Sequence, residues 1–127
     1  MKVKTKINNQ NLKRLHNAML DCLVKSVDAM RSDLLESETM PFDTGASERA
    51  TYLDVSKLKS GKVRLCHGMP YDRRNYFHPE FNFRTDKNTN AQGLWLETYI
   101  HGVKKMFVPM AYAKFLKGFL KDNISRD

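Results

Sequence analysis

The fold is decided by residues 11–34, which read NLKRLHNAMLDCLVKSVDAMRSDL. Apolar side chains recur through this stretch at spacings of three and four residues, the period of an α-helix with one apolar face. They are Leu12, Leu15, Met19, Leu23, Val27, Met30 and Leu34. An asparagine among residues 8–11 supplies a start signal, and we expect the helix to end near Ser37, ahead of Pro41.

A helix of about 25 residues would be about 37 Å long, since each residue adds 1.5 Å. That is long for so small a domain, so part of the apolar face is expected to project past the chain's own core. We predict that neighbouring copies of the chain cover this part.

Two short segments further along alternate between inward and outward side chains, as half-buried strands do. In residues 50–55 the inward set is Thr51, Leu53 and Val55, and in residues 62–66 it is Val63 and Leu65. A turn at Ser60-Gly61 separates the two segments. The pattern predicts an antiparallel hairpin.

The remainder combines short helical turns, a long loop and a second helix. Residues 71–76 are compatible with one or two helical turns, and residues 80–93 are polar and aromatic without a period. Trp95 closes this loop as an apolar anchor and is predicted to be buried. Two apolar rows between Met106 and Leu120 predict the second helix, with Pro109 in its first turns.

These elements predict an α+β fold in which a long N-terminal helix and a C-terminal helix pack on a small antiparallel β-sheet, with a long elaborated loop over residues 67–94. One domain is expected to span residues 1–127, because the length of 127 residues suits a single core. Residues 1–8 form its basic leader and residues 122–127 its tail.

Composition restricts the class of protein. The net charge of +8 favours an acidic or nucleic-acid partner, although no run of five like charges marks a nucleic-acid tail. No apolar run reaches the roughly 18 residues of a membrane span, and the N-terminus lacks the apolar block of a signal peptide. We therefore expect a cytosol-like compartment and no membrane partner. Cys22 and Cys66 are expected to be buried thiols.

One motif points to an enzyme. Residues 42–46 read FDTGA and match the signature of aspartic proteases, in which two aspartates share a proton and activate water. A homodimeric protease would supply the second Asp43 by symmetry. A helix nevertheless precedes the motif where a protease needs strands, so a turn that exploits Gly45 is the competing interpretation.

The histidines do not predict a metal site. His67, His78 and His101 lack the close spacing that metal ligands need, and Cys66 and His67 point to opposite faces of a strand. We predict no catalytic residue, no metal and no cofactor.

Arginines and aromatics gather around residues 71–83. Arg73 and Arg74 lie between Tyr71 and Tyr76, and Phe77, Phe81 and Phe83 follow. This mixture is typical of single-stranded nucleic-acid sites and equally of protein–protein hot spots. Aromatics that fill a core beside solvated arginines are a third possibility.

The succession of segments resembles that of a known protein family. PFDTG at 41–45, PYDRRNYFHPEFNF at 70–83, NTNA at 88–91 and the Leu94-Trp95 pair precede the terminal helix. Over residues 38–121 this order resembles the minor capsid proteins of tailed phages that infect Gram-positive bacteria, of the tail-completion or head–tail connector type. Asp72 stands where that family more usually has a small residue.

The resemblance implies a structural virion protein, assembled in the host cytoplasm, whose copies form a ring in the neck between head and tail. It implies as neighbours a head-closure or adaptor protein on the portal side and a tail terminator or tail tube protein, with DNA only in transit. A basic nucleic-acid-binding module and the Asp43 protease remain the alternatives. The residues expected at protein interfaces are Tyr71, Arg73, Arg74, Tyr76, His78, Phe81, Phe83, Asn88 and Trp95.

Overall fold

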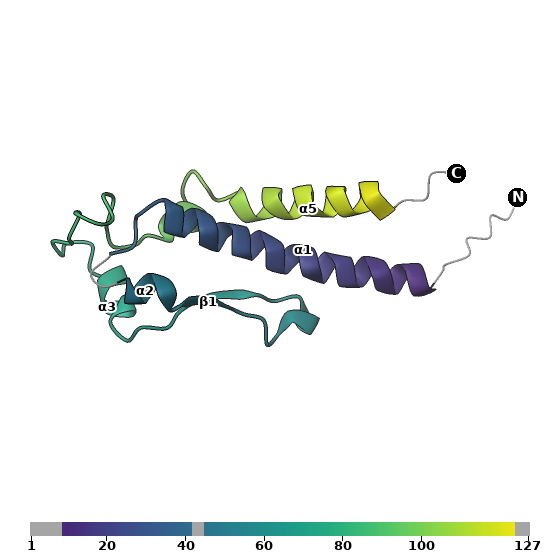
Figure 1. Ribbon diagram of the computed structural model, residues 1–127, viewed down its shortest axis with the longest axis horizontal. Coiled ribbons are helices and arrows are strands. Elements are labelled where there is room, and N and C mark those ends of the chain that lie inside the picture. The colour runs from purple at the N-terminus through teal and green to yellow at the C-terminus, as the bar shows by residue number, and fades with distance from the viewer. Residues whose placement is uncertain (1–8, 42–44, 124–127) are drawn as a thin grey trace, which may run out of the picture.

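The computed structural model describes residues 9–41 and 45–123 (Figure 1). The helices and strands in chain order are α1 (Asn9–Glu36), α2 (Ala46–Arg49), β1 (Thr51–Asp54), η1 (Leu58–Ser60), β2 (Arg64–His67), α3 (Asp72–Tyr76), α4 (Glu97–Ile100) and α5 (Phe107–Asn123). The predicted α+β fold is confirmed. The leader 1–8 and the Asp43 motif lie outside the described residues, and α5 extends to Asn123, into the predicted tail.

The long helix α1 is the axis on which the other elements pack. It runs from Asn9 to Glu36, as its apolar period predicts. A row of small buried residues, Ala18, Cys22 and Ser26, lies along it at four-residue spacing. Small side chains let two helices approach closely, and α5 runs beside α1 (Figure 1). The C-terminal helix therefore packs mainly on the other helix rather than on the sheet.

The hairpin lies along another side of α1 (Figure 1). Its antiparallel strands pair Leu53 with Leu65, and the Arg31 side chain of α1 donates a hydrogen bond of 2.8 Å to the Thr51 carbonyl. The inward direction of Val55 is the wrong part of the strand prediction. Because β1 ends at Asp54, Val55 leaves the alternation and is exposed.

The apolar core is built at the C-terminal end of α1. Leu34, Met40 and Trp95 are its fully buried members. Packed against them are Leu35, Leu65, Tyr76, Leu96 and Tyr99. The core thus joins α1, the hairpin, α3 and the end of the long loop, and it lies directly beneath the segment in which the interface residues were predicted. Within the described ranges, no helix combines the length and apolar character needed to cross a bilayer.

Candidate functional site

The candidate site is a surface formed by α3 and the start of the loop that follows it. We call it the arginine–aromatic surface and define it by side chains that are exposed or half-buried. They are Tyr71, Arg73, Arg74, Phe77, His78, Phe81 and Phe83. Six of the seven belong to the predicted interface set, and the structure adds Phe77, whose side chain is 60% exposed. Because α3 is so short, helical periodicity in the sequence could not predict that the Phe77 side chain faces outward.

Three of the aromatic rings on this surface contact one another. His78 lies parallel to Phe81, with 4.7 Å between ring centroids and 8° between planes. The Arg74 guanidinium lies 5.4 Å from the centroid of the Phe81 ring, and Phe83 contacts Phe81 edge-on. Cation–π and aromatic contacts of this kind restrict side chains to one arrangement. Arg74, His78, Phe81 and Phe83 therefore form one connected group of side chains on this surface.

Charge on the surface is partly compensated. His78 lies 2.7 Å from a Glu80 carboxylate oxygen, and this hydrogen bond lowers the pKa of Glu80 below its usual value. Arg84 pairs with Asp86 in the same loop. By contrast, Arg73 is exposed, and its side chain forms no hydrogen bond or ion pair with any residue in the described ranges. Its guanidinium is thus available to an acidic or carbonyl-rich partner.

The buried carboxylate of Asp72 holds α3 in place. Asp72 is 3% exposed, and its two carboxylate oxygens accept hydrogen bonds from the Ser47 hydroxyl at 2.6 Å and the Met69 backbone N–H at 3.3 Å. Burying a carboxylate is costly unless its oxygens are hydrogen-bonded. Asp72, which stands where the resembled family more usually has a small residue, thus holds α3 against α2.

His67 connects the hairpin to the core. The Thr51 hydroxyl donates to the Ser47 carbonyl, so it accepts from Nδ1–H of His67, and Nε2 of His67 accepts from the Trp95 indole N–H at 3.1 Å. Both ring nitrogens are therefore occupied in the neutral imidazole. Burial lowers the pKa of His67, although the nearby Asp72 opposes this shift.

This network predicts a pH-dependent stability. The unfolded chain takes up a proton on His67 near the ordinary pKa of about 6.5, whereas the folded chain resists it. Stability conferred by neutral His67 is thus present above that pKa and is lost as the pH falls below it. We expect the urea midpoint to fall between about pH 7.5 and pH 5.5. His67→Gln cannot bind the proton and should flatten this dependence; an equally steep profile in the variant would contradict the assignment.

Two members of the predicted interface set, Asn88 and Trp95, are deeply buried and contact the interior of the chain. Asn88 donates hydrogen bonds of 2.7 Å to the Met40 carbonyl and to a Glu48 carboxylate oxygen, and Trp95 is 2% exposed. Their side chains face the chain's own core and lie outside the arginine–aromatic surface, so contact of these two residues with a partner stays a prediction. They anchor the loop. The burial predicted for Trp95 is confirmed.

The loop returns to α3 by a close backbone approach. A Cβ atom at Gly93 would lie 2.7 Å from Cα of Pro79, so only glycine fits without a shift of the backbone. The next residue, Leu94, donates its N–H to the Tyr76 carbonyl at 2.8 Å. Residues 77–96 contain no helix or strand, yet they are fixed at several points.

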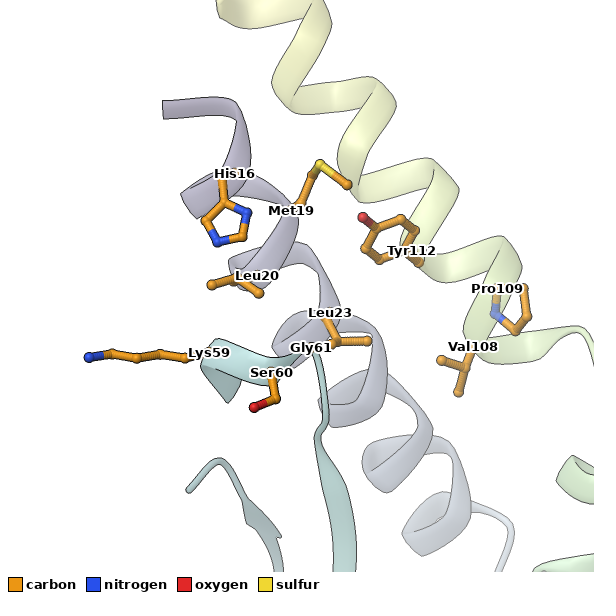
Figure 2. A pocket seen from close by; sticks show the side chains of 10 residues that line it. All are labelled: His16, Met19, Leu20, Leu23, Lys59, Ser60, Gly61, Val108, Pro109 and Tyr112. Carbon is orange, nitrogen blue, oxygen red and sulfur yellow. The ribbon is translucent and has the colours of Figure 1, made fainter. Parts of the chain in front are cut away.

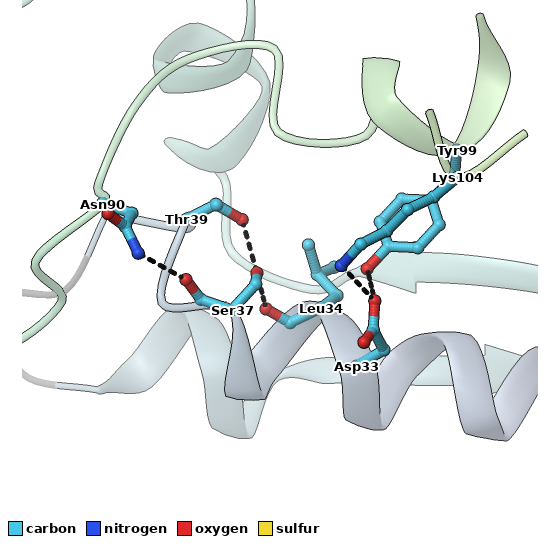
Figure 3. Close-up of polar contacts among 7 residues, drawn as sticks. All are labelled: Asp33, Leu34, Ser37, Thr39, Asn90, Tyr99 and Lys104. Atoms are coloured by element: carbon cyan, nitrogen blue, oxygen red, sulfur yellow. Dashed lines mark hydrogen bonds and ion pairs between the residues drawn. The ribbon is translucent and has the colours of Figure 1, made fainter. Parts of the chain in front are cut away.

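Polar contacts also attach the loop to the residue that follows α1, and attach α4 and the segment after it to α1 (Figure 3). Asn90 donates to the Ser37 carbonyl at 3.1 Å. Asp33 accepts from the Tyr99 hydroxyl and from Lys104. Partial burial opposes ionisation of Asp33, but these hydrogen bonds lower its pKa overall, while burial and Asp33 raise the pKa of Tyr99. Sequence reasoning missed this cluster because its members lie far apart in the chain.

The three histidines that were considered as metal ligands do not lie together in the structure. His67 is held in the core network, His78 stacks on the surface, and His101 is exposed. In the part of the chain that the structure describes, no three His, Cys, Asp or Glu side chains are arranged to hold a metal ion. No protein family, curated protein or solved structure matches this chain.

Proposed function

We propose that this chain is a structural subunit of the neck of a tailed phage, where its copies form a ring that joins the portal-side head assembly to the tail and lets DNA pass. The observation that carries the proposal is the arginine–aromatic surface. Residues 70–83, which bear the most specific part of the resemblance to connector proteins, contribute all seven of its side chains.

The chemistry of this surface suits a protein partner. Arginine, tyrosine and other aromatics are enriched in the residues that supply most binding energy at interfaces. The hydrogen bond between Ser47 and Asp72 holds α3 in place, and the stack of His78 on Phe81 orders the start of the loop. The surface therefore has a defined shape before a partner binds. We assign this surface to contact with a head-closure or adaptor protein, or with a tail terminator or tail tube protein.

Ring formation requires a second surface on each subunit, because a head-to-tail ring joins two different patches of the same chain. DNA would pass through the ring without tight binding, because each phosphate contact that increases affinity would slow its passage.

Two groups that could serve nucleophilic catalysis are engaged in structural contacts. The Ser47 hydroxyl donates to Asp72, and both nitrogens of His67 are hydrogen-bonded. Neither side chain is positioned as a nucleophile or as its base.

Loss of the chain should stop assembly at one step. An amber mutation in the phage gene that encodes it should yield DNA-filled heads and free tails that fail to join, and the chain supplied from a plasmid should restore joined particles. Electron microscopy of lysates measures this outcome directly. Normal joined particles without the chain, or its absence from purified virions, would contradict the proposal.

A further inference from the structure

A groove opens between α1, α5 and the tip of the hairpin (Figure 2). Its volume is about 660 Å3. The apolar part of the lining comes from both helices and consists of Met19, Leu20, Leu23, Val108, Pro109 and Tyr112. His16 stands at one end, and residues 59–61 of the hairpin tip form one side.

The groove is the uncovered continuation of the core. The apolar face of α1 is more exposed toward the N-terminus: Leu34 and Val27 are 0% and 8% exposed, whereas Met19 and Leu12 are 40% and 50% exposed. Trp95 packs on Leu34 at the covered end. An apolar face that continues past its own core is typical of a site for another molecule.

The rim of the groove is basic. Lys59 lines it, and its side chain extends outward from the hairpin tip in Figure 2. No acidic side chain is found among the described residues that line the groove. On the bordering segments, exposed lysines outnumber the exposed acid Asp21; they are Lys13, Lys57, Lys62, Lys105 and Lys117. An occupant that combines an apolar face with negative charge would complement both the floor and the rim.

We propose that this groove binds an amphipathic helix of a partner protein, apolar on one face and acidic along its flanks. Between Leu12 and Leu23 the open face of α1 rises about 17 Å, which matches a helix of about 11 residues. Such a helix would place apolar side chains at i, i+3 or i+4 and i+7 against Leu20, Leu23 and Tyr112. The inference does not depend on the proposed function.

Three other occupants fit less well. A second copy that docked groove to groove, in a symmetric dimer, would bring two basic rims together. The chain's own leader carries Lys2, Lys4 and Lys6 and would meet the same repulsion. A nucleic acid needs stacking platforms for its bases, and Tyr112 supplies the one phenol ring among the described lining residues.

Two labelled peptides of about 12 residues test the proposal by fluorescence anisotropy with the full chain. Both carry leucines on one helical face; one has glutamates along the flanks and the other lysines. We expect saturable binding of the acidic peptide, at least about tenfold tighter than that of the basic one. Met19→Asp should abolish this binding, and Lys59→Glu with Lys62→Glu should weaken it about tenfold.

The control pair is Lys25→Glu with Lys87→Glu, which makes the same charge change outside the groove and should leave binding unchanged. Circular dichroism verifies that every variant is folded. Four results would overturn the proposal: no saturable binding of the acidic peptide, equal binding of both peptides, binding that Met19→Asp leaves intact, or tighter binding of a single-stranded oligonucleotide. Self-association of the chain that Met19→Asp removes would instead assign the groove to a second copy and would equally overturn it.

Discussion

Trp95→Ala should destabilise the chain by about 3 to 5 kcal/mol, the range measured when large aromatic side chains are removed from cores. Trp95 is 2% exposed, packs with Leu34 and Met40, and donates its indole N–H to His67. The substitution therefore leaves a cavity and an unpaired imidazole nitrogen in the same place. Since domains of this kind are stable by only about 5 to 15 kcal/mol, urea denaturation should show a large shift of the midpoint.

Phe77→Ala provides the matched control for the loss of an aromatic ring. Phe77 contacts Tyr76 edge-on but is 60% exposed, so the change should cost less than about 1 kcal/mol. Equal losses for Trp95→Ala and Phe77→Ala would show that the loop is anchored somewhere other than the Trp95 core.

Arg73→Glu combined with Arg74→Glu should leave the chain folded and abolish the joining of heads to tails. Both side chains are exposed, so within the subunit the reversal removes the contact of Arg74 with the Phe81 ring and leaves the core intact. Against a partner surface that accepts arginines, it places like charges together at a cost of several kcal/mol per contact. Symmetry repeats this cost around the ring. In a complementation assay, the infectious titre should fall at least about 100-fold.

Two controls accompany the arginine variant. Lys25→Glu with Lys114→Glu makes an equal change of charge on α1 and α5 and should preserve the titre. Asp43→Asn removes the carboxylate that a protease would require and should also preserve it. Infectious particles from the arginine variant would refute its interface role, and loss of infectivity with uncleaved precursors from Asp43→Asn would support the protease instead.

The helices were predictable because their apolar periods are long. Seven apolar residues at regular spacing define α1, and α5 lies where its two apolar rows predict, with Pro109 in its first turn. The helices α2 and α4 were not predicted. Each has four residues, too few to establish a helical period, and each depends on neighbouring segments for its position.

The candidate site was only partly predictable, for a related reason. Composition identifies Arg73, Arg74 and the phenylalanines, but it does not tell which aromatics face outward. Burial of Asn88 depends on its contact with Met40, 48 residues away, and burial of Trp95 depends on the arrangement of α1. The groove was partly foreseen, because the apolar face of α1 exceeds what a small core can cover; its other walls come from segments distant in sequence.

The attachment of segment 77–96 at Asn88, Gly93 and Trp95 has a thermodynamic consequence for any partner. Association usually includes an entropic penalty of about 0.5 to 1.5 kcal/mol for each rotamer-rich side chain that it immobilises. In this chain, folding has already ordered segment 77–96. Binding of a partner to the arginine–aromatic surface therefore loses less of its interaction energy to entropy. A synthetic peptide of residues 70–84 would lack this preorganisation and should bind the same partner far more weakly than the folded chain does.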